Sequence, residues 1–442
     1  MIKNYLTLAL KVLRRRPFYT FISLFGVSFT LMILMLITSM GDALFGANQP
    51  MTEVDRMVFI PGLSRYTQFY DTIYAVDSVM MDDGTMRYDS TMEMEESGSN
   101  NSDGSMSYYF TDEFLRNFSD VESYTFFAPY GNIDGFLEGR KISFRSYYTD
   151  HNYWEVFDFD FLYGFPYGED DVKEQNKAVV LTDKSALEYF GEISSQVIGK
   201  SINLGEEIFV VKGIVERPLK DDPSIHGDIY LPVTTIDNRK LDSRTLDGPF
   251  AAVFLATSAG KRESVINQIN FFAENFTMPP EEDYQEIRLY PGTSTEVMAS
   301  GLLQTRDYDQ AVLILFIPLL ILLVLFLALP LINLINLNIS RVYERKSEIA
   351  VRKAFGADSR NILYQFIFEN LVLTFIGGAI GLLLALFVIR WVNANDLIGI
   401  VRLAFSVKVF SYFIIVIVLF GLLSGIVPAY RMSRTHISNA LR

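Results

Sequence analysis

Four long stretches of this chain contain no charged residue, and they constrain its fold more than any other feature. They cover residues 18–40, 311–337, 371–389 and 409–430. About 20 apolar residues suffice for a helix to cross the hydrocarbon core of a bilayer. We therefore predict an integral membrane α-helical protein with four transmembrane helices, the third of which we place at residues 367–390.

The first stretch could be a cleaved signal peptide, because Arg14, Arg15 and Arg16 precede it. A signal peptide has an apolar core of about 7–15 residues, followed by a cleavage site of small residues. This stretch is longer and has no clear site of that kind. We expect it to be a retained membrane anchor.

Basic residues are concentrated in three segments. Residues 1–17, 338–366 and 431–442 contain 14 basic and three acidic residues, although the whole chain has a net charge of −14. Short cytoplasmic segments of membrane proteins are enriched in Lys and Arg. We therefore predict that both termini are cytoplasmic, that residues 41–310 form a large domain outside, and that residues 391–408 form a short outer loop.

The composition excludes several kinds of site. The chain has no cysteine and three histidines, which excludes disulfides and thiolate metal sites. Its negative charge argues against nucleic-acid binding. Gly199, Lys200 and Ser201 end like a phosphate-binding loop, but the motif needs glycine where Ser194 stands. We assign no catalytic, cofactor-binding or metal-binding residue to this chain.

The charge-free stretches also lack the buried ionisable groups that pumps and channels usually need, which argues against ion translocation by these helices. Gly377, Gly381 and Ala385 recur at four-residue spacing in the third stretch, and Gly421 and Gly425 do so in the fourth. Small residues at this spacing allow helices to approach closely. The spacing indicates either packing within one subunit or a dimer interface.

The outside domain has an α/β pattern. Helices are expected at residues 111–118 and 261–272, and each lies beside predicted strands. The flanking strands are expected at residues 54–60, 121–128, 251–257 and 285–290. Between the two units lies a β-rich insert, about residues 132–248, with strands expected at 178–181, 201–204, 208–215 and 228–232. This order predicts one split α/β subdomain interrupted by the insert.

Two segments of the outside domain are unusual in composition. Residues 77–107 are acidic and rich in methionine, with little periodicity, which favours a flexible insertion, either a mobile loop or the tip of a long hairpin. A copper(I) site at Met92 and Met94 is a less favoured alternative. Residues 153–167 are densely aromatic, and we interpret them as part of the core rather than as a ligand site.

The loop between the second and third spans is predicted to contain a helix over residues 341–356. Glu348 and Arg352 form an i, i+4 pair, and Gly356 is placed to end the helix. A basic helix beside a membrane can bind anionic lipids, or it can dock on a cytoplasmic partner. The residues alone leave both alternatives open.

Several motifs resemble one family. EIAVRKAFGA at 348–357, PAYRMSR at 428–434 and the basic lead-in at 6–16 are similar to the FtsX/MacB-like ABC transporter permeases. YWEVF at 153–157, IGKSI at 198–202 and FVVKGIV at 209–215 resemble the periplasmic core domain of MacB-like proteins. Nearly the whole chain is covered.

This resemblance implies a fold, a location and partners. It implies a protein of the inner membrane whose residues 1–17 form an amphipathic cytoplasmic helix and whose outside domain is porter-like with a β-rich insert. The partners would be a second permease copy, as a homo- or heterodimer, and a separate cytoplasmic ATPase that binds ATP and Mg. The residues expected to face the ATPase are Glu344, Arg345, Glu348, Ile349, Arg352, Lys353, Phe355 and Gly356.

The resemblance also implies mechanotransmission, in which ATP hydrolysis inside the cell moves the outside domain. The expected role is export of a peptide, antibiotic, toxin or envelope component. The alternatives are release of lipoproteins and FtsX-like control of a cell-wall hydrolase, with a periplasmic adaptor or hydrolase as a further partner. A membrane-anchored receptor without an ATPase is a third hypothesis.

Overall fold

The computed structural model describes most of the chain: residues 17–81, 86–137, 139–220, 222, 224–237, 241, 243–280, 282–344, 351, 355, 358–399 and 401–433. These residues form two compact units. The helical unit comprises residues 1–48, 219–221 and 313–442. The sheet unit comprises residues 49–218 and 222–312.

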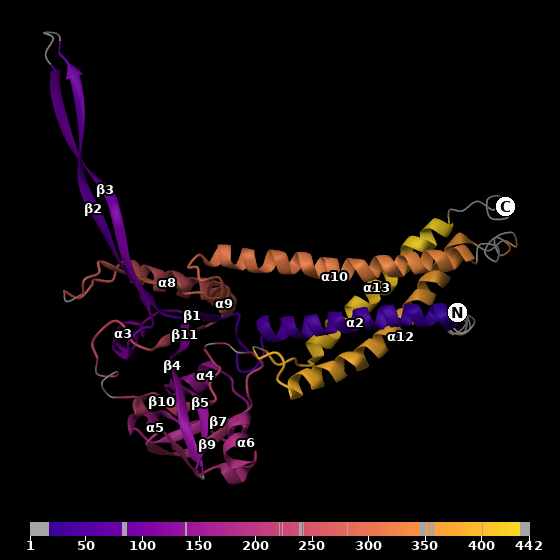
Figure 1. Cartoon of the computed structure of the whole chain (residues 1–442), viewed down its shortest axis with the longest axis horizontal. Coiled ribbons are helices and arrows are strands. Elements are labelled where there is room, and N and C mark those ends of the chain that lie inside the picture. The colour runs from indigo at the N-terminus through magenta and orange to yellow at the C-terminus, as the bar shows by residue number, and fades with distance from the viewer. Residues whose placement is uncertain are drawn as a thin grey trace. The chain divides into compact units, whose positions relative to one another are not determined.

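The helical unit is built from four long helices (Figure 1), which are α2 (Pro17–Phe45), α10 (Tyr308–Glu344), α12 (Ser359–Ala394) and α13 (Val407–Ser433). Three apolar segments are long enough to cross a membrane: Thr20–Phe45, Tyr308–Phe326 and Ile367–Ala394. The described apolar part of α13, Val407–Leu423, is shorter. Three helices of the described chain therefore meet the length requirement for a membrane span. The fourth span stays a prediction from the sequence.

Apolar side chains hold α2, α12 and α13 together. The shared core contains Val27 and Leu31 from α2, Leu373 from α12, and Phe413 and Ile417 from α13, each at most 2% exposed. By contrast, α10 exposes apolar side chains at successive positions, and four consecutive residues of a helix point around its full circumference. These exposed residues are Leu319, Leu320, Ile321 and Leu322.

The sheet unit contains one large mixed sheet. Its strands are β1 (Met57–Ile60), β4 (Val121–Leu137), β5 (Arg140–Thr149), β6 (Phe161–Gly164), β7 (Ala178–Thr182), β8 (Ser201–Leu204), β9 (Glu207–Val215), β10 (Ile229–Pro232) and β11 (Ala251–Ala256). The order is β1-β11-β4-β5-β10-β7-β9-β6, and β8 pairs with both β9 and β4. The pairs β5/β10 and β7/β9 are parallel, and the others are antiparallel.

The pairing of β8 closes a ring of strands, β4-β5-β10-β7-β9-β8. The closing pair joins Gly135 of β4 to Leu204 of β8. A side chain at Gly135 would collide with the ring of Phe144, since its Cβ would lie 2.7 Å from Phe144 Cε2. Glycine at position 135 therefore allows β4 to pair with β8 above the buried side chain of Phe144.

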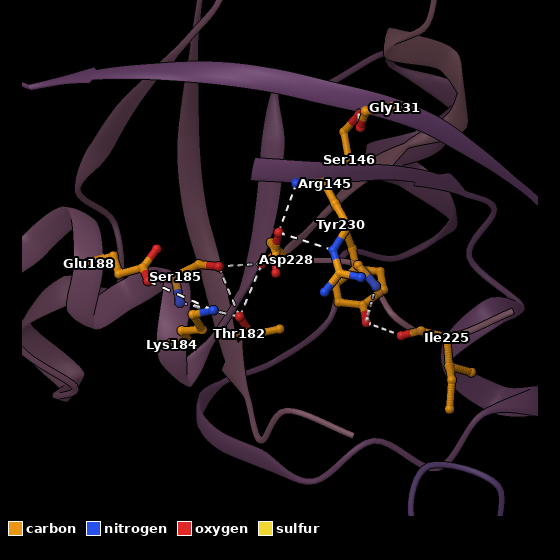
Figure 2. Close-up of polar contacts among 11 residues, drawn as sticks. Gly131, Arg145, Ser146, Thr182, Lys184, Ser185, Glu188, Ile225, Asp228 and Tyr230 are labelled. Atoms are coloured by element: carbon orange, nitrogen blue, oxygen red, sulfur yellow. Dashed lines mark hydrogen bonds and ion pairs between the residues drawn. The ribbon is translucent and has the colours of Figure 1, made fainter. Parts of the chain in front are cut away.

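Polar contacts around Asp228 join three elements of this ring (Figure 2). The carboxylate Oδ2 of Asp228 accepts a hydrogen bond from the backbone N–H of Arg145 at 2.9 Å. The carbonyl oxygen of Asp228 accepts the hydroxyls of Ser185 at 2.8 Å and Thr182 at 3.2 Å. Asp228 thus fixes the start of β10 against β5, the end of β7 and helix α6 (Asp183–Phe190).

Helices cover the β1-β11-β4 end of the sheet. Rings from α3 (Tyr108–Phe114) and α8 (Arg262–Glu274) pack together, with Phe110 and Phe272 centroids 6.3 Å apart. The remaining elements are α4 (Tyr153–Val156), α5 (Glu169–Lys173) and α9 (Ser294–Leu303), and the 3-10 turns η1 (Ser195–Val197), η2 (Val233–Thr235) and η3 (Ala259–Lys261).

The aromatic segment at 153–167 belongs mainly to the core, as predicted. Tyr153, Phe157 and Tyr167 are at most 1% exposed, and the rings of Phe159 and Tyr230 lie 5.3 Å apart. Phe165, 64% exposed, and Tyr163, 37% exposed, are the exceptions. The core interpretation is therefore confirmed for the inward-facing rings.

A second sheet contains three strands, β12 (Glu286–Leu289), β2 (Leu63–Met80) and β3 (Met86–Gly104), in the order β12-β2-β3. The last two form a long hairpin that extends beyond the rest of the unit (Figure 1). Of the two sequence alternatives for residues 77–107, the described part takes the hairpin. Its period-2 pattern was missed because acidic residues stand where a half-buried strand would carry apolar ones.

Candidate functional site

Glycines bring α2 and α12 into close contact. A Cβ added at Gly377 would lie 2.6 Å from Val27 Cγ1, and one at Gly381 would lie 2.7 Å from the carbonyl oxygen of Ser28. Real Cβ atoms do not approach so closely, so only glycine fits at both positions. Ala385, one turn further along α12, is completely buried.

A second close contact joins α12 to α13. A Cβ at Gly378 would lie 2.5 Å from Ile417 Cδ1, and a Cβ at Gly421 would lie 2.7 Å from Leu371 Cδ2. The four-residue spacing in the sequence did not identify Gly378. Gly377 faces α2, whereas Gly378, the next residue, faces α13. These glycines all contact helices of the same chain. Gly425 lies on α13, but its packing is outside the described part.

One acidic residue is buried within the third apolar segment. No such residue was expected from the sequence, because Glu369 lies just before the charge-free stretch 371–389. Helix α12 continues through Glu369, which is 7% exposed and lies within Ile367–Ala394. Its neighbour Asn370 is equally buried, and the carbonyl of Asn370 accepts the hydroxyl of Thr374 at 2.8 Å. The expectation of spans free of buried charge is therefore wrong for α12.

An ion pair joins the end of α2 to the start of α13. Lys408 Nζ lies 2.9 Å from Asp42 Oδ1, and the Asp42 side chain is only 7% exposed. The hydroxyl of Ser406 donates to Asp42 Oδ2 at 3.3 Å and also accepts the backbone N–H of Val409 at 3.1 Å. Ser406 therefore caps α13 while it contacts the carboxylate that fixes α2.

The loop between α12 and α13 also binds a short segment from elsewhere in the chain. The backbone N–H of Arg402 donates to the carbonyl of Leu219 at 2.6 Å, and Val401 and Lys220 form an antiparallel β-bridge. Leu219 packs with apolar side chains of this region, including Leu403. Leu219 and Lys220 belong to the helical unit, although their sequence neighbours belong to the sheet unit.

This contact, named here the outer clasp (Leu219, Lys220, Val401 and Arg402), is supported from the α12 side. The side-chain amide of Asn393 donates to the carbonyl of Leu403 at 2.7 Å and accepts its N–H at 3.0 Å. No local pattern signals the clasp, because its bridge partners are 181 residues apart in the sequence.

Most of the predicted ATPase-facing residues lie outside the described part: Arg345, Glu348, Ile349, Arg352, Lys353 and Gly356. Glu344 is the last residue of α10. Phe355 is described, and its side chain is 90% exposed. Among the residues that the structure describes, none covers that ring.

In the sheet unit, Asp150 has a structural role. Its carboxylate accepts the hydroxyl of Thr125 at 2.6 Å and the backbone N–H groups of Phe126 and Tyr153, both at 3.0 Å. Burial raises the pKa of Asp150 to about 6, although these donors act in the opposite direction. Because all three donors belong to the scaffold, this carboxylate is explained by the fold.

The phosphate-loop alternative can be judged directly. Gly199 has a φ of +82°, and Ser201 begins strand β8 rather than a helix. Lys200 pairs with Glu192 at 3.0 Å. A phosphate-binding loop opens a helix and directs its lysine at the phosphates, so the backbone here differs from that of such a loop.

Two family models match this chain. The MacB-like periplasmic core domain matches residues 20–270, and the FtsX-like permease C-terminal region matches residues 313–437. The first match alone covers more than half of the chain.

Curated relatives include the macrolide export ATP-binding/permease protein MacB of Salmonella paratyphi A, 23% identical over 273 residues, which are 59% of this chain and 36% of MacB. The chain thus spans just over a third of the length of that relative. The uncharacterized ABC transporter permease YvrN of Bacillus subtilis is 22% identical over 67% of this chain and 69% of YvrN.

Solved structures also resemble part of the chain. The periplasmic region of MacB from Actinobacillus actinomycetemcomitans matches 46% of this chain and 85% of that structure, with 17% identity and a TM-score of 0.33. The extracellular domain of the ABC-type transporter YknZ from Gram-positive bacteria matches 40% and 84%, with 16% identity and a TM-score of 0.31.

Proposed function

Since this chain belongs to the family of FtsX-like permeases with a MacB-like periplasmic core domain, we propose that it is the permease subunit of an ABC transporter. A separate cytoplasmic ATPase would bind ATP and Mg and hydrolyse the nucleotide. Two copies of the permease, or this chain and a related one, would form the membrane part. The cargo would be a peptide, antibiotic, toxin or envelope component.

The close packing of α12 carries the mechanical part of this proposal. Positions 377 and 381 have no room for even one additional methyl group, and at positions 378 and 421 a methyl group would press on the side chains of Ile417 and Leu371. A substrate path between these helices would need space that the packing does not leave. ATP-driven movement of the helices, transmitted to the periplasmic domain, is therefore favoured over passage of cargo through this part of the chain.

The outer clasp offers a route for that movement. Val401 and Arg402 lie in the loop between α12 and α13, and they bind Leu219 and Lys220 through backbone groups. In the sequence, the segments before and after 219–221 both belong to the periplasmic domain. A displacement of α12 or α13 would thus pull on the chain of that domain.

The exposed surface of α10 supports a second permease copy. Leu313, Ile317, Leu320 and Val324 are each more than half exposed in the single chain. These residues belong to the apolar surface that α10 exposes around its circumference. Such a surface is suited to packing against another membrane helix.

The test is co-purification of the full chain from gently solubilised membranes, followed by mass spectrometry. We expect a P-loop ATPase to accompany the wild-type chain. Phe355→Asp should remove the ATPase, because it replaces an apolar ring that is 90% exposed by a charged carboxylate. Phe271→Asp is the matched control, since Phe271 is 68% exposed in the sheet unit.

Glu348→Lys distinguishes ATPase docking from lipid binding by the same loop. The substitution makes a basic segment more basic, so attraction to anionic lipid should increase. Loss of the ATPase from Glu348→Lys would therefore support docking. Retention of the ATPase by both variants, or an intact wild-type chain that yields no ATPase after crosslinking, would contradict the proposal.

A further inference from the structure

The hairpin β2–β3 has an outer part that no third strand covers. The last pair between β2 and β12 is Tyr66 with Glu286. From Thr67 to Asn101 the two strands pair with each other, and no other strand of the described chain pairs with them. We call residues 67–81 and 86–101 the arm. A two-stranded hairpin without further support is marginally stable in water.

The register of the arm gives its two faces different chemistry. Successive residues of a strand lie on opposite faces. One face, here the Tyr/Met face, contains the cross-strand pairs Tyr70–Glu96, Thr72–Met94, Tyr74–Met92, Val76–Ser90 and Met80–Met86. The other, the acidic face, contains Asp71–Glu95, Ile73–Glu93, Ala75–Thr91, Asp77–Asp89 and Val79–Arg87.

The Tyr/Met face exposes large apolar side chains where they can be described. Tyr70 is 54% exposed, Met92 is 66% exposed and Met94 is 73% exposed. Neighbouring exposed apolar groups on one face are typical of interaction surfaces, and methionine adapts well to the shape of a partner.

The acidic face places like charges directly opposite each other. Asp71 faces Glu95, and Asp77 faces Asp89, in register. Like charges at directly opposed positions destabilise a strand pair. The one basic residue in the sequence of the arm, Arg87, stands on the same face two positions from Asp89, and it is far along the strands from the Asp71–Glu95 pair. A cationic group brought by another molecule would relieve the repulsion and gain attraction from both carboxylates.

The charge of the arm selects among the possible occupants. Residues 67–81 and 86–101 contain six acidic residues and one basic residue, a net charge of −5. Two such arms repel each other, and an anionic membrane surface repels either one. The hairpin is an extended surface rather than a cavity, so its size suits a protein partner.

We propose that the arm is a docking surface for a basic protein outside the cytoplasmic membrane. The partner would lay apolar side chains on the Tyr/Met face and direct Lys or Arg residues to the carboxylates of the acidic face. This proposal is independent of the ATPase: the arm contains no residue of the membrane helices, and ATPase co-purification should be unchanged when the arm is altered.

The partner can be captured by a photocrosslinking amino acid placed at Met94 of the full chain in cells. Phe271, 68% exposed elsewhere in the sheet unit, is the control position. We expect one basic protein to crosslink at position 94 and not at position 271. Capture alone is not sufficient, so the purified partner is then titrated against the full chain in lipid nanodiscs.

Two double variants make the titration specific. Asp71→Lys/Glu95→Lys keeps a like-charge pair within the hairpin but inverts its attraction for a cation. Glu206→Lys/Glu216→Lys makes the same change of charge at exposed positions outside the arm. We expect the arm variant to raise the Kd of the basic partner by at least about tenfold. The control variant should have a Kd close to that of the wild type. Rising salt concentration should weaken the wild-type complex.

Several outcomes would overturn the proposal. They are a crosslink from position 94 to a second copy of this chain or to lipid, a partner that is acidic or neutral, and absence of any crosslink at both Met92 and Met94. Equal Kd values for the arm variant and its control would overturn it as well. If no ATPase co-purified with the wild-type chain, that result would instead contradict the transporter proposal alone.

Discussion

The backbone N–H of Arg402 donates a 2.6 Å hydrogen bond to the carbonyl oxygen of Leu219, two residues separated by 183 positions in the sequence. Together with the bridge between Val401 and Lys220, this contact fastens the loop between α12 and α13 to a segment that continues into the periplasmic domain. Backbone contacts do not depend on side-chain identity, so the clasp is best tested by removing a backbone donor.

Arg402→Pro deletes the donor N–H and should uncouple the clasp. We expect normal membrane insertion and a loss of transport-coupled ATPase stimulation of about tenfold, which corresponds to about 1.4 kcal/mol. A disulfide between Lys220→Cys and Val401→Cys should restore the stimulation under oxidising conditions. The Cα atoms of directly opposed residues in antiparallel strands lie about 4.5–5.5 Å apart, a separation that a disulfide can bridge.

The chain contains no native cysteine, so the engineered pair is unambiguous. Ser201→Cys/Val210→Cys, a pair that bridges β8 and β9, is the control and should not rescue Arg402→Pro. Wild-type stimulation in the Arg402→Pro variant would show that the clasp has no part in coupling.

Substitution of the packed glycines should destabilise the helical unit. In Gly381→Ala, the new Cβ would lie 2.7 Å from a backbone oxygen of α2, which cannot move aside without shifting that helix. We expect a loss of about 1–3 kcal/mol, measured as a lower Tm in detergent. Gly26→Ala is the control, because no atom lies within 4 Å of its added Cβ; equal Tm values for the two variants would refute the packing argument.

The Asp42–Lys408 pair should stabilise the outer end of the helical unit. Asp42→Asn leaves the ammonium of Lys408 beside a buried neutral amide, and we expect a loss of about 1–2 kcal/mol. Glu169→Gln breaks the exposed pair between Glu169 and Lys173, whose side chains are 55% and 67% exposed; it should leave the stability close to that of the wild type. A thermal unfolding series in detergent compares the two, and a reversed order would argue against this role of Asp42.

Asp150 should make the stability of the periplasmic domain depend on pH. Its pKa is about 6 in the folded chain, raised mainly by burial, against an ordinary value of about 4. Between those pH values the folded state binds more protons than the unfolded state. Stability should therefore fall as pH rises from about 4 to about 6, by up to about 3 kcal/mol, and then level off.

Trp154 fluorescence can report this dependence within the full chain. The chain has two tryptophans, so a Trp391→Phe background leaves Trp154 as the sole emitter in the core beside Tyr153. Asp150→Asn should be less stable overall, because one carboxylate oxygen becomes a donor, but the fall between pH 4 and 6 should disappear. The same slope in both proteins would exclude Asp150 as its origin.

Much of this architecture follows from local patterns. Charge-free stretches predicted the helices, because burying a charge in hydrocarbon is costly. The strand predicted at residues 201–204 is β8, and the helix predicted at 261–272 is α8, Arg262–Glu274. Such elements are visible in the sequence because their periodicity depends on neighbouring residues.

The tertiary structure alone decided how distant segments meet. Gly378 became a packing position only when Ile417 of another helix was placed against it. Glu369 became a buried acid only because α12 continues past the charge-free core. The opposition of Asp71 and Glu95 depends on hairpin register, and the clasp joins backbone groups that have no sequence signature. Periodicity specifies which face of an element is apolar; which partner covers that face is set by packing over the whole chain.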